Sequence, residues 1–289
     1  MASSAVLRHF NRTYTQRIGV LEDSFLGTGR PLGVSRLLFE IGSASAGATV
    51  AELRERLDLD SGHVSRMLRR LEREGLVRVT PDPADRRRRV VHLTDAGRTA
   101  WAELDLRSEE RAARILEVLT PRQQQRLDEA LATADLLVRA ATVHLREVAA
   151  TDTIARRATS RYYDELAARF PTGFDPETAP EPDATYVVAT SDGEPVAYGG
   201  IRPAPQAGTA TAEIKRMWVD PEWRGAGLGS RMLRHLEGLA AGQGYAHVVL
   251  DTNATLAEAI AMYERAGYRR IERYNDNPYA ELFFAKELT

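Results

Sequence analysis

The pattern of apolar and polar residues predicts a helical first half of the chain. Apolar positions recur every three or four residues over two short stretches, which predicts helices at Val50–Leu57 and His63–Glu74. Thr49 and Glu52 have the spacing of a capping box for the first helix, and Ser61 is expected to cap the second. Longer amphipathic helices are expected at 5–26, 97–119 and 122–148.

Strand and helix patterns alternate in the second half. Leu256–Ala266 is expected to be a helix closed by Gly267, and a further helix is expected to begin at the Gly-rich stretch near residue 228. The pattern is ambiguous near 153–158, where a first strand would be expected. Apolar strands are predicted at Glu213–Val219, Ala246–Asp251, Tyr268–Ile271 and Glu281–Leu288.

Composition supports two domains. The chain has 289 residues, of which 43% are hydrophobic, enough for two separate cores. Residues 1–150 hold 24 arginines against 21 acidic residues, whereas residues 151–289 hold 15 basic against 20 acidic residues and most of the predicted strands. We therefore expect one domain at 1–150 and another at 151–289.

Several classes of protein are disfavoured. The absence of cysteine excludes disulfides and cysteine nucleophiles. No apolar run has the length of a membrane span, and the first residues are too polar for a secretory signal, so a soluble cytoplasmic protein is expected. No pair of histidines has ligand spacing, so no metal site is expected.

A glycine-rich loop follows the predicted strand Glu213–Val219. Arg224–Gly229 reads Arg-Gly-Ala-Gly-Leu-Gly and leads into an amphipathic helix. Glycines allow close approach of a phosphate, and the unpaired N–H groups of a helix N-terminus favour an anion. Ser230 stands where a Walker A loop would have lysine and where a dinucleotide fingerprint would have its third glycine, so neither motif fits.

The loop resembles the pyrophosphate loop of the GNAT acyl-CoA N-acyltransferases, Gln/Arg-x-x-Gly-x-Gly/Ala. A second region also resembles that family, at Ala259, Met262, Tyr263, Gly267 and Tyr268. The resemblance implies an α/β fold with a mixed central sheet, acetyl-CoA as the cofactor, and direct acetyl transfer to an amine. The residues that it implies for coenzyme binding are Met217, Trp218, Val219, Arg224, Gly225, Ala226, Gly227, Leu228, Gly229, Ser230, Asn253 and Tyr263.

The resemblance also implies catalytic residues. Glu213 is the candidate general base, directly or through a water, and Tyr263 is the candidate general acid for the leaving thiolate. Glu213 could instead bind the substrate ammonium or cap the strand, and Tyr263 could simply pack in the core. Lys215 and Arg216 could bind a carboxylate, which favours a small amine or amino-acid-like acceptor. Acceptor-binding elements or structural turns are expected at Tyr162, Tyr163, Phe170, 173–176 and 275–279.

The first half has the features of a DNA-binding domain. The predicted helix His63–Glu74 has one apolar face and one face rich in Arg and Ser, which suits a recognition helix in a major groove or an ordinary solvated face. Two short strands follow, joined by a turn with four consecutive arginines, Arg86–Arg89. Such a hairpin can place cations against phosphates or in the minor groove.

This region resembles the MarR family of winged-helix regulators. The resemblance lies in Gly-Leu-Val-x-x-x-x-Asp-x-x-Asp-Arg-Arg from Gly75 and in Leu-Thr-Asp-Ala-Gly at Leu93–Gly97. It implies that Asp85 braces Arg87, that Arg86 or Arg88 enters the minor groove, and that the long helices form a homodimer on a palindromic duplex rather than a monomeric bundle. The expected DNA-binding residues are Ser61, His63, Ser65, Arg66, Arg69, Arg70, Arg86, Arg87, Arg88 and Arg89.

Together the two resemblances predict a bifunctional protein, a mainly α winged-helix regulator followed by an acetyl-CoA-dependent N-acetyltransferase. Two alternatives stay open. The second domain could bind acetyl-CoA only as a signal, or it could acetylate protein lysines.

Overall fold

The computed structural model describes residues 4–20, 22–44, 47–83, 85–170, 173–175, 183–191 and 193–288. Contacts between residues divide the chain into two compact units, Met1–Glu129 and Ala130–Thr289. The division falls inside helix α6, Pro121–Thr142. The composition predicts a boundary near residue 150 instead. That boundary stays a prediction of where one functional domain ends and the next begins.

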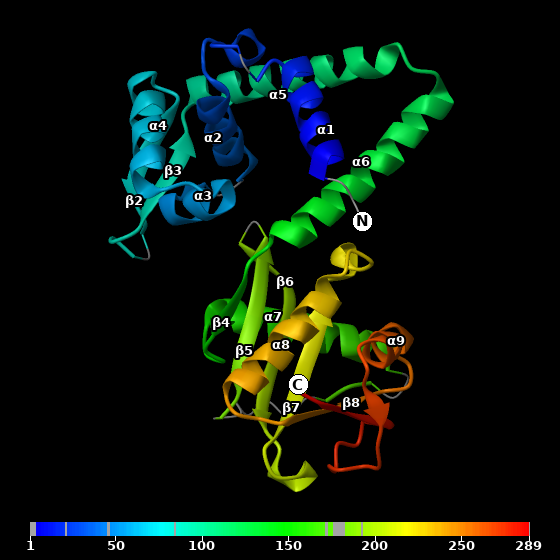
Figure 1. Ribbon diagram of the computed structural model, residues 1–289. Coiled ribbons are helices and arrows are strands. Elements are labelled where there is room, and N and C mark those ends of the chain that lie inside the picture. Colours follow the sequence, from blue (N-terminus) through cyan, green and yellow to red (C-terminus); the bar gives the residue numbers. More distant parts are fainter. Residues whose placement is uncertain are drawn as a thin grey trace. The chain divides into compact units, whose positions relative to one another are not determined.

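The first unit is mainly helical with a small sheet (Figure 1). Its three strands have the order β1-β3-β2, and β2 and β3 form an antiparallel hairpin. The elements are α1 (Ser4–Arg17), the short 3₁₀ helix η1 (Phe25–Gly27), α2 (Leu32–Ser43), β1 (Ala48–Thr49), α3 (Val50–Leu57), α4 (Ser61–Arg73), β2 (Val77–Pro81), β3 (Arg89–Leu93) and α5 (Asp95–Glu117). Helix α6 begins in this unit.

The local signals of the helix pair are mostly confirmed. Thr49 and Glu52 form both hydrogen bonds of the capping box of α3. The N-cap of α4 is Asp60, not Ser61 as expected, because the Asp60 carboxylate accepts the backbone N–H of His63 at 2.9 Å. The apolar face of α4 packs in the core of this unit through Val64, Met67, Leu68 and Leu71.

The first predicted long helix is shorter than expected. Helix α1 ends at Arg17 instead of continuing to residue 26. Gly19 has a φ of +76°, a left-handed conformation that ends the helix and turns the chain.

The second unit contains a seven-stranded mixed sheet with the order β4-β5-β6-β7-β8-β10-β9. All neighbouring strands are antiparallel except β7 and β8. The elements are β4 (Leu145–Val148), α7 (Thr153–Arg169), β5 (Thr185–Ser191), β6 (Glu194–Pro203), η2 (Pro205–Ala207), β7 (Thr211–Val219), η3 (Pro221–Trp223), α8 (Leu228–Gly242), β8 (His247–Thr252), α9 (Ala257–Arg265), β9 (Arg269–Arg270) and β10 (Leu282–Glu287).

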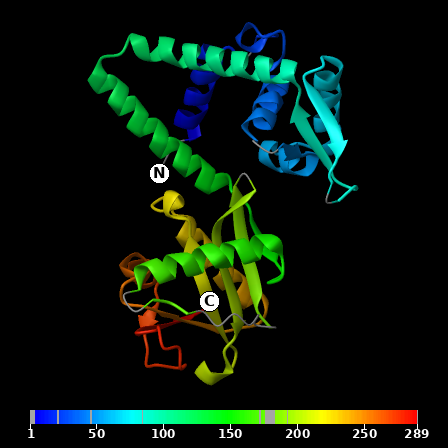
Figure 2. The same ribbon diagram turned by 180° about the vertical axis from the view of Figure 1, so that it is seen from behind.

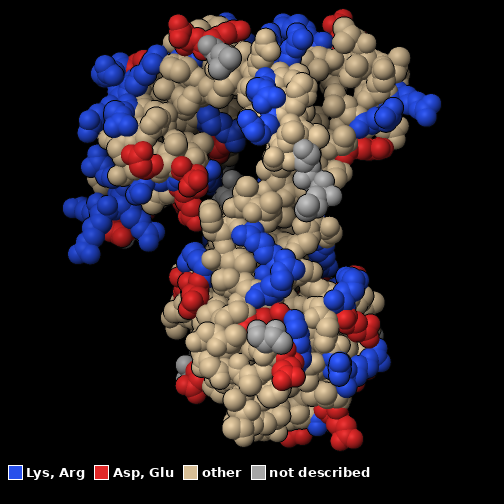
Figure 3. Space-filling model, viewed as in Figure 1, with Lys and Arg blue, Asp and Glu red and all other residues tan. Residues whose placement is uncertain are grey.

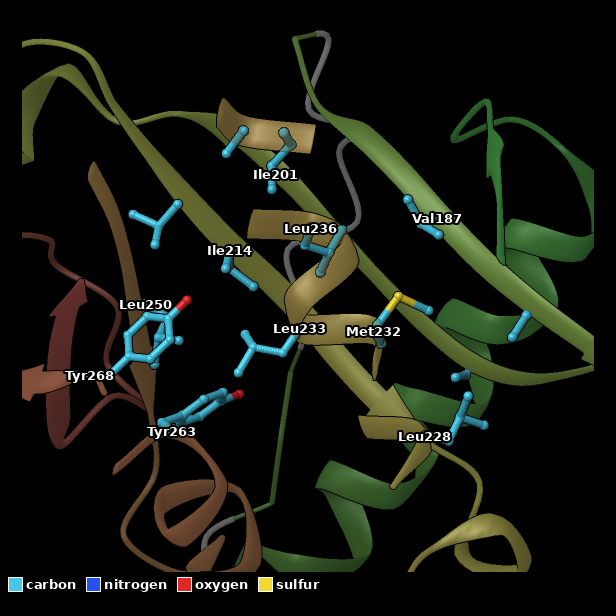
Figure 4. Close-up of a cluster of buried hydrophobic side chains, with 14 of the residues drawn as sticks. Val187, Ile201, Ile214, Leu228, Met232, Leu233, Leu236, Leu250, Tyr263 and Tyr268 are labelled. Carbon is cyan, nitrogen blue, oxygen red and sulfur yellow. The ribbon is translucent and has the colours of Figure 1, made fainter. Parts of the chain in front are cut away.

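Helices cover both faces of this sheet. Helices α8 and α9 lie on one face (Figure 1), and α7 crosses the other (Figure 2). On the α8 face, Met232, Leu233 and Leu236 pack against Ile214 and Leu250 of the central strands (Figure 4). Burying such side chains contributes about 1.5–3 kcal/mol each. The predicted winged-helix unit followed by an α/β unit is therefore confirmed.

The helix predicted at 122–148 is wrong at its end. Helix α6 stops at Thr142, and Leu145–Val148 form the edge strand β4, which pairs with β5. The free carbonyl of Ala140 accepts a hydrogen bond from Arg231 at 2.9 Å. Pairing with a sheet outweighs the helical pattern of these residues. Residues 153–158, where the pattern is ambiguous and a first strand would be expected, lie in helix α7, Thr153–Arg169.

Candidate functional site

The glycine-rich loop lies at the N-terminus of α8. Gly225 and Gly227 both have a φ of +81°, a backbone conformation that favours glycine, and Gly227 is the N-cap of α8. The first N–H groups of α8 have no partner within the helix, so the loop presents backbone donors and the positive end of the helix dipole. These features suit a pyrophosphate.

A cavity of about 570 Å³ opens beside this loop. It is lined by residues of α7, the end of β7, the glycine loop, α8 and α9, which come from three separate stretches of the chain, 162–169, 217–230 and 256–265. Ten of the residues expected to bind coenzyme line it: Met217, Trp218, Val219, Arg224, Gly225, Gly227, Leu228, Gly229, Ser230 and Tyr263.

Two expected coenzyme residues have other contacts. Ala226 packs against the hydrophobic core. The side chain of Asn253 accepts the N–H of Thr255 at 3.0 Å and donates to the carbonyl of Tyr279 at 2.9 Å, so it orders the turn after β8. Neither residue lines the cavity.

The strands β7 and β8 separate where the cavity begins. Their parallel pairing runs from Thr211 to Glu213 on β7, although β7 continues to Val219. Arg216 has a φ of +55° at an irregularity in the pairing with β6, which is typical of a β-bulge. The end of β7 therefore has one backbone edge that β8 does not cover, and an extended ligand could pair with it.

Two tyrosines belong to the cavity lining. Tyr263 of α9 and Tyr162 of α7 both line it. Burial, with a smaller contribution from the charge of Asp251, raises the pKa of Tyr263 well above its ordinary value. Burial and the neighbouring Tyr263 and Asp251 raise the pKa of Tyr162 in the same direction. Both phenols stay protonated at neutral pH and can donate a proton.

Glu213 does not line this cavity. Its side chain is fully buried, and its carboxylate accepts hydrogen bonds from Arg202 at 2.7 Å and Tyr274 at 2.9 Å. Lys215 lies 3.7 Å away. A carboxylate held in this way is an ion-pair partner inside the sheet, and this arrangement gives a substrate no direct access to it. The predicted role as base remains untested.

The sequence pattern did not indicate Glu165 of α7, which organises the cavity wall. Its carboxylate accepts from Arg224 at 2.6 Å and from Nε1 of Trp218 at 3.0 Å. Burial acts to raise the pKa of Glu165, but the hydrogen bonds and charge of Arg224, aided by Arg169, lower it overall. Arg224 also donates to the carbonyl of Val219 at 3.0 Å, so its guanidinium joins the start of the glycine loop to the end of β7.

An aromatic cluster adjoins the α7 side of this region. The rings of Phe174 and Tyr279 are 4.7 Å apart, and Phe174 also contacts Tyr163 and Phe170. The structure thus brings together the α7 end and the 275–279 loop, which the sequence suggested as acceptor elements. Pro176 of that prediction lies outside the described residues.

In the first unit, α4 presents its basic face to solvent. Arg66, Arg69 and Arg73 line a shallow groove with Glu72. Arg70 differs, because it pairs with Glu74 at 3.0 Å and donates to the carbonyl of Gly29. The other expected residues of this helix, Ser61, His63 and Ser65, are exposed or half-buried near its N-terminal end.

The hairpin β2–β3 carries the arginine turn at its tip (Figure 3). Arg86, Arg87, Arg88 and Arg89 are all exposed. The expected salt bridge of Asp85 goes to Arg88 at 3.5 Å rather than to Arg87, whose backbone N–H bonds to the Asp85 side chain at 3.0 Å. Of the four arginines at the tip, Arg88 is the one whose guanidinium contacts a described carboxylate. Arg86, Arg87 and Arg89 expose guanidinium groups that make no such contact with the described residues.

Family comparisons match both units. Residues 149–268 match the acetyltransferase (GNAT) family, and residues 28–88 match the MarR family. An IAA acetyltransferase of Azospirillum brasilense is 33% identical over 118 residues, which cover 39% of this chain and 74% of that protein. The N-alpha-acetyltransferase RimI of Mycobacterium tuberculosis is 35% identical over 102 residues, which cover 35% of this chain and 61% of that protein.

The match does not span the whole of these relatives. An uncharacterised N-acetyltransferase of Schizosaccharomyces pombe is 30% identical, and the match covers 64% of that protein and 36% of this chain.

Among solved structures, a putative acyl-CoA N-acyltransferase of Klebsiella pneumoniae is 26% identical with a TM-score of 0.43, covering 52% of this chain and 99% of that one. A MarR-family regulator of Rhodococcus sp. RHA1 is 19% identical with a TM-score of 0.39, covering 46% of this chain and 94% of that one.

Membrane-spanning helices and metal-ligand clusters can be looked for in the described residues only. None of their helices combines the length and apolar character needed to cross a bilayer. Their His, Asp and Glu side chains form no cluster of three or more that could hold a metal ion.

Proposed function

The chain belongs to the GNAT family of acetyltransferases and carries a MarR-family domain, and from this we propose a DNA-binding regulator that also transfers an acetyl group from acetyl-CoA to a small amine. The functional division is proposed at 1–150 and 151–289. The observation that carries the enzymatic half is a cavity lined by the glycine loop, the end of β7 and Tyr263, beside the edge of β7 that β8 does not cover.

Each part of that cavity has a chemical task in the proposed reaction. The loop N–H groups and the α8 dipole would hold the pyrophosphate, and the open edge of β7 near Met217 and Val219 would pair with the pantetheine arm. The residues fit this coenzyme because the cavity lining combines the glycine loop, which offers backbone donors, with the protonated phenols Tyr162 and Tyr263. Tyr263 would give its proton to the departing thiolate.

The test of the enzymatic half is release of free CoA from acetyl-CoA across a panel of L-amino acids, arylalkylamines and polyamines. The full chain should release CoA with at least one of them. Binding of acetyl-CoA by calorimetry with no release across the panel would instead favour a sensor that transfers nothing. Release only with lysine-containing peptides would favour protein acetylation.

The DNA-binding half rests on the exposed arginines of α4 and of the hairpin tip. Cations on an exposed surface neutralise phosphates and release condensed counterions, so the affinity for a duplex should fall steeply with salt. A salt titration of binding to a palindromic and a non-palindromic duplex tests both the contact and the proposed preference for palindromes.

We also propose a homodimer. Helices α1, α5 and α6 expose large apolar side chains, among them Val6 at 70%, Leu106 at 59% and Leu137 at 49% of their full exposure. Such side chains on long helices suit burial by a second copy of the same helices. Sedimentation equilibrium of the full chain measures this, and a monomer at micromolar concentration would contradict it.

A further inference from the structure

The α7 face of the sheet carries two carboxylates on neighbouring strands. Side chains alternate between the faces of a strand, and Ala212, Ile214 and Leu250 pack in the core beneath α8. Glu213 of β7 and Asp251 of β8 therefore lie on the opposite face, which α7 covers. Asp251 lies beyond the last residue of β8 that pairs with β7, so it stands where the two strands have separated.

An asparagine joins these carboxylates. The amide nitrogen of Asn275 lies 3.2 Å from Glu213 Oε1 and 2.7 Å from Asp251 Oδ2. An amide has two N–H donors, so each carboxylate accepts one of them. Asn277 adds a second donor to the same Oδ2 at 3.2 Å. Within the described part of the chain, no donor contacts the other oxygen, Oδ1.

The two carboxylates differ in access. Glu213 is fully buried, and Arg202 neutralises it at 2.7 Å. Asp251 is only partly buried, and its charge contributes to the raised pKa values of both cavity phenols, Tyr162 and Tyr263. Neither carboxylate lines the cavity beside the glycine loop. Asp251 is the more exposed of the two, so it is the one that an amine entering where β7 and β8 separate could reach.

We propose that Asp251 receives the amino group of the acceptor, binds it as the ammonium and removes its first proton, and that Glu213 positions Asp251 through Asn275. This inference rests on the acetyl transfer proposed above. It assigns the base to the end of β8 and gives Glu213 an indirect role.

Protons and electron pairs balance in the proposed reaction. Asp251 takes one proton from the ammonium, which frees the nitrogen lone pair to attack the thioester carbonyl carbon. The C–N bond forms, the tetrahedral intermediate collapses, and the C–S bond breaks with its electron pair on sulfur. Tyr263 protonates that thiolate, the nitrogen returns its second proton to the Tyr263 phenolate, and Asp251 releases its proton to solvent. The products are the N-acetyl amine, CoA with a free thiol, and one proton.

The test compares Asp251→Asn with Asp183→Asn in the full chain. Asp183 is exposed, lies just before β5 and belongs to none of the proposed binding elements, so its variant makes the same chemical change outside the site. CoA release is measured with acetyl-CoA and the same panel of L-amino acids, tyramine and spermidine, and acetyl-CoA affinity is measured by calorimetry. Loss of a general base should lower kcat/KM for the amine at least about 100-fold, with acetyl-CoA affinity unchanged.

Two further variants distinguish the loss of a base from a misfolded protein. Asp251→Glu keeps a carboxylate and should restore part of the rate that Asp251→Asn loses. Asn275→Ala should lower kcat between about 10- and 100-fold, because a displaced base loses its alignment, while KM for acetyl-CoA stays the same. A merely structural Asn275 would change the unfolding midpoint and leave kcat unaltered.

Two results would overturn the proposal. If the wild-type chain releases CoA with an amine and Asp251→Asn does so equally well, the assignment of Asp251 is wrong and the acetyl transfer stands. If the wild-type chain binds acetyl-CoA and releases no CoA with any amine, the acetyl transfer fails and the assignment fails with it.

Discussion

The arginines of the hairpin tip and those of the sheet in the second unit use the same side chain in opposite ways. Arg88 keeps 68% of its side-chain exposure even while it contacts Asp85, and its neighbours Arg86 and Arg87 are also exposed. Arg202, by contrast, pairs with a carboxylate of zero exposure. Exposed cations act at a distance and are screened by salt, whereas a buried pair fixes geometry and is screened little. The contrast indicates a surface for a polyanion in one unit and an ordered interior around a cavity in the other.

The largest effect is expected where the buried pair is broken. Arg202→Ala leaves the fully buried Glu213 with only the more distant Lys215, at 3.7 Å, as a cation, which should cost up to about 3–5 kcal/mol in the free energy of unfolding. Urea unfolding measures the loss. The control is Arg234→Ala, an exposed arginine of α8, for which the change should stay within about 0.5 kcal/mol. Similar losses in both variants would remove the contrast between buried and exposed arginines.

The next largest effect is expected on the rate of acetyl transfer in the cavity, not on the stability of the fold. Tyr263→Phe removes the proposed proton donor and should lower kcat about 100-fold without changing acetyl-CoA affinity. Because burial raises the pKa of Tyr263, the phenol stays protonated, and kcat should not fall through loss of this acid below about pH 10. Steady-state release of CoA, measured from pH 7 to 10, checks both the loss of kcat in the variant and the constant kcat of the wild type.

Tyr268→Phe is the matched control for that variant. Tyr268 is also buried and packs 5.9 Å from the Tyr263 ring, but it is not part of the cavity lining. Its variant should keep the wild-type kcat. An equal loss of kcat in both variants would mean that Tyr263 acts through packing and not through its hydroxyl.

The same contrast explains what the sequence could and could not predict. Features that depend on neighbouring residues were predicted, including the strand–loop–helix unit at Arg224–Gly229, the capping box at Thr49 and the arginine hairpin. Contacts between distant residues were not. Glu165 and Arg224 are 59 residues apart, and no local pattern links them. The end of α6 was wrong for the same reason, because β4 forms only when β5 is beside it.

The hairpin tip should give the third effect. Arg86→Ala with Arg87→Ala removes two exposed guanidinium groups, so affinity for any duplex should fall, and the slope of log affinity against log salt should decrease by about 1 for each lost phosphate contact. Fluorescence anisotropy over a salt series measures it. Arg122→Ala, exposed on α6, is the control and should leave the slope unchanged. An unaltered slope in the double variant would exclude the tip as a contact with DNA.

The smallest effect distinguishes the arginine that Asp85 braces from the one that it leaves unpaired. The Asp85–Arg88 pair is exposed on both sides, at 46% and 68%, so it should contribute less than about 1 kcal/mol to stability. Arg88→Ala should therefore lower duplex affinity less than Arg87→Ala, since Arg87 uses only its backbone N–H on Asp85 and keeps its guanidinium available. The same anisotropy assay at one low salt concentration compares the two single variants. A larger loss for Arg88→Ala would mean that the brace itself, or Arg88 in place of Arg87, presents the charge to DNA.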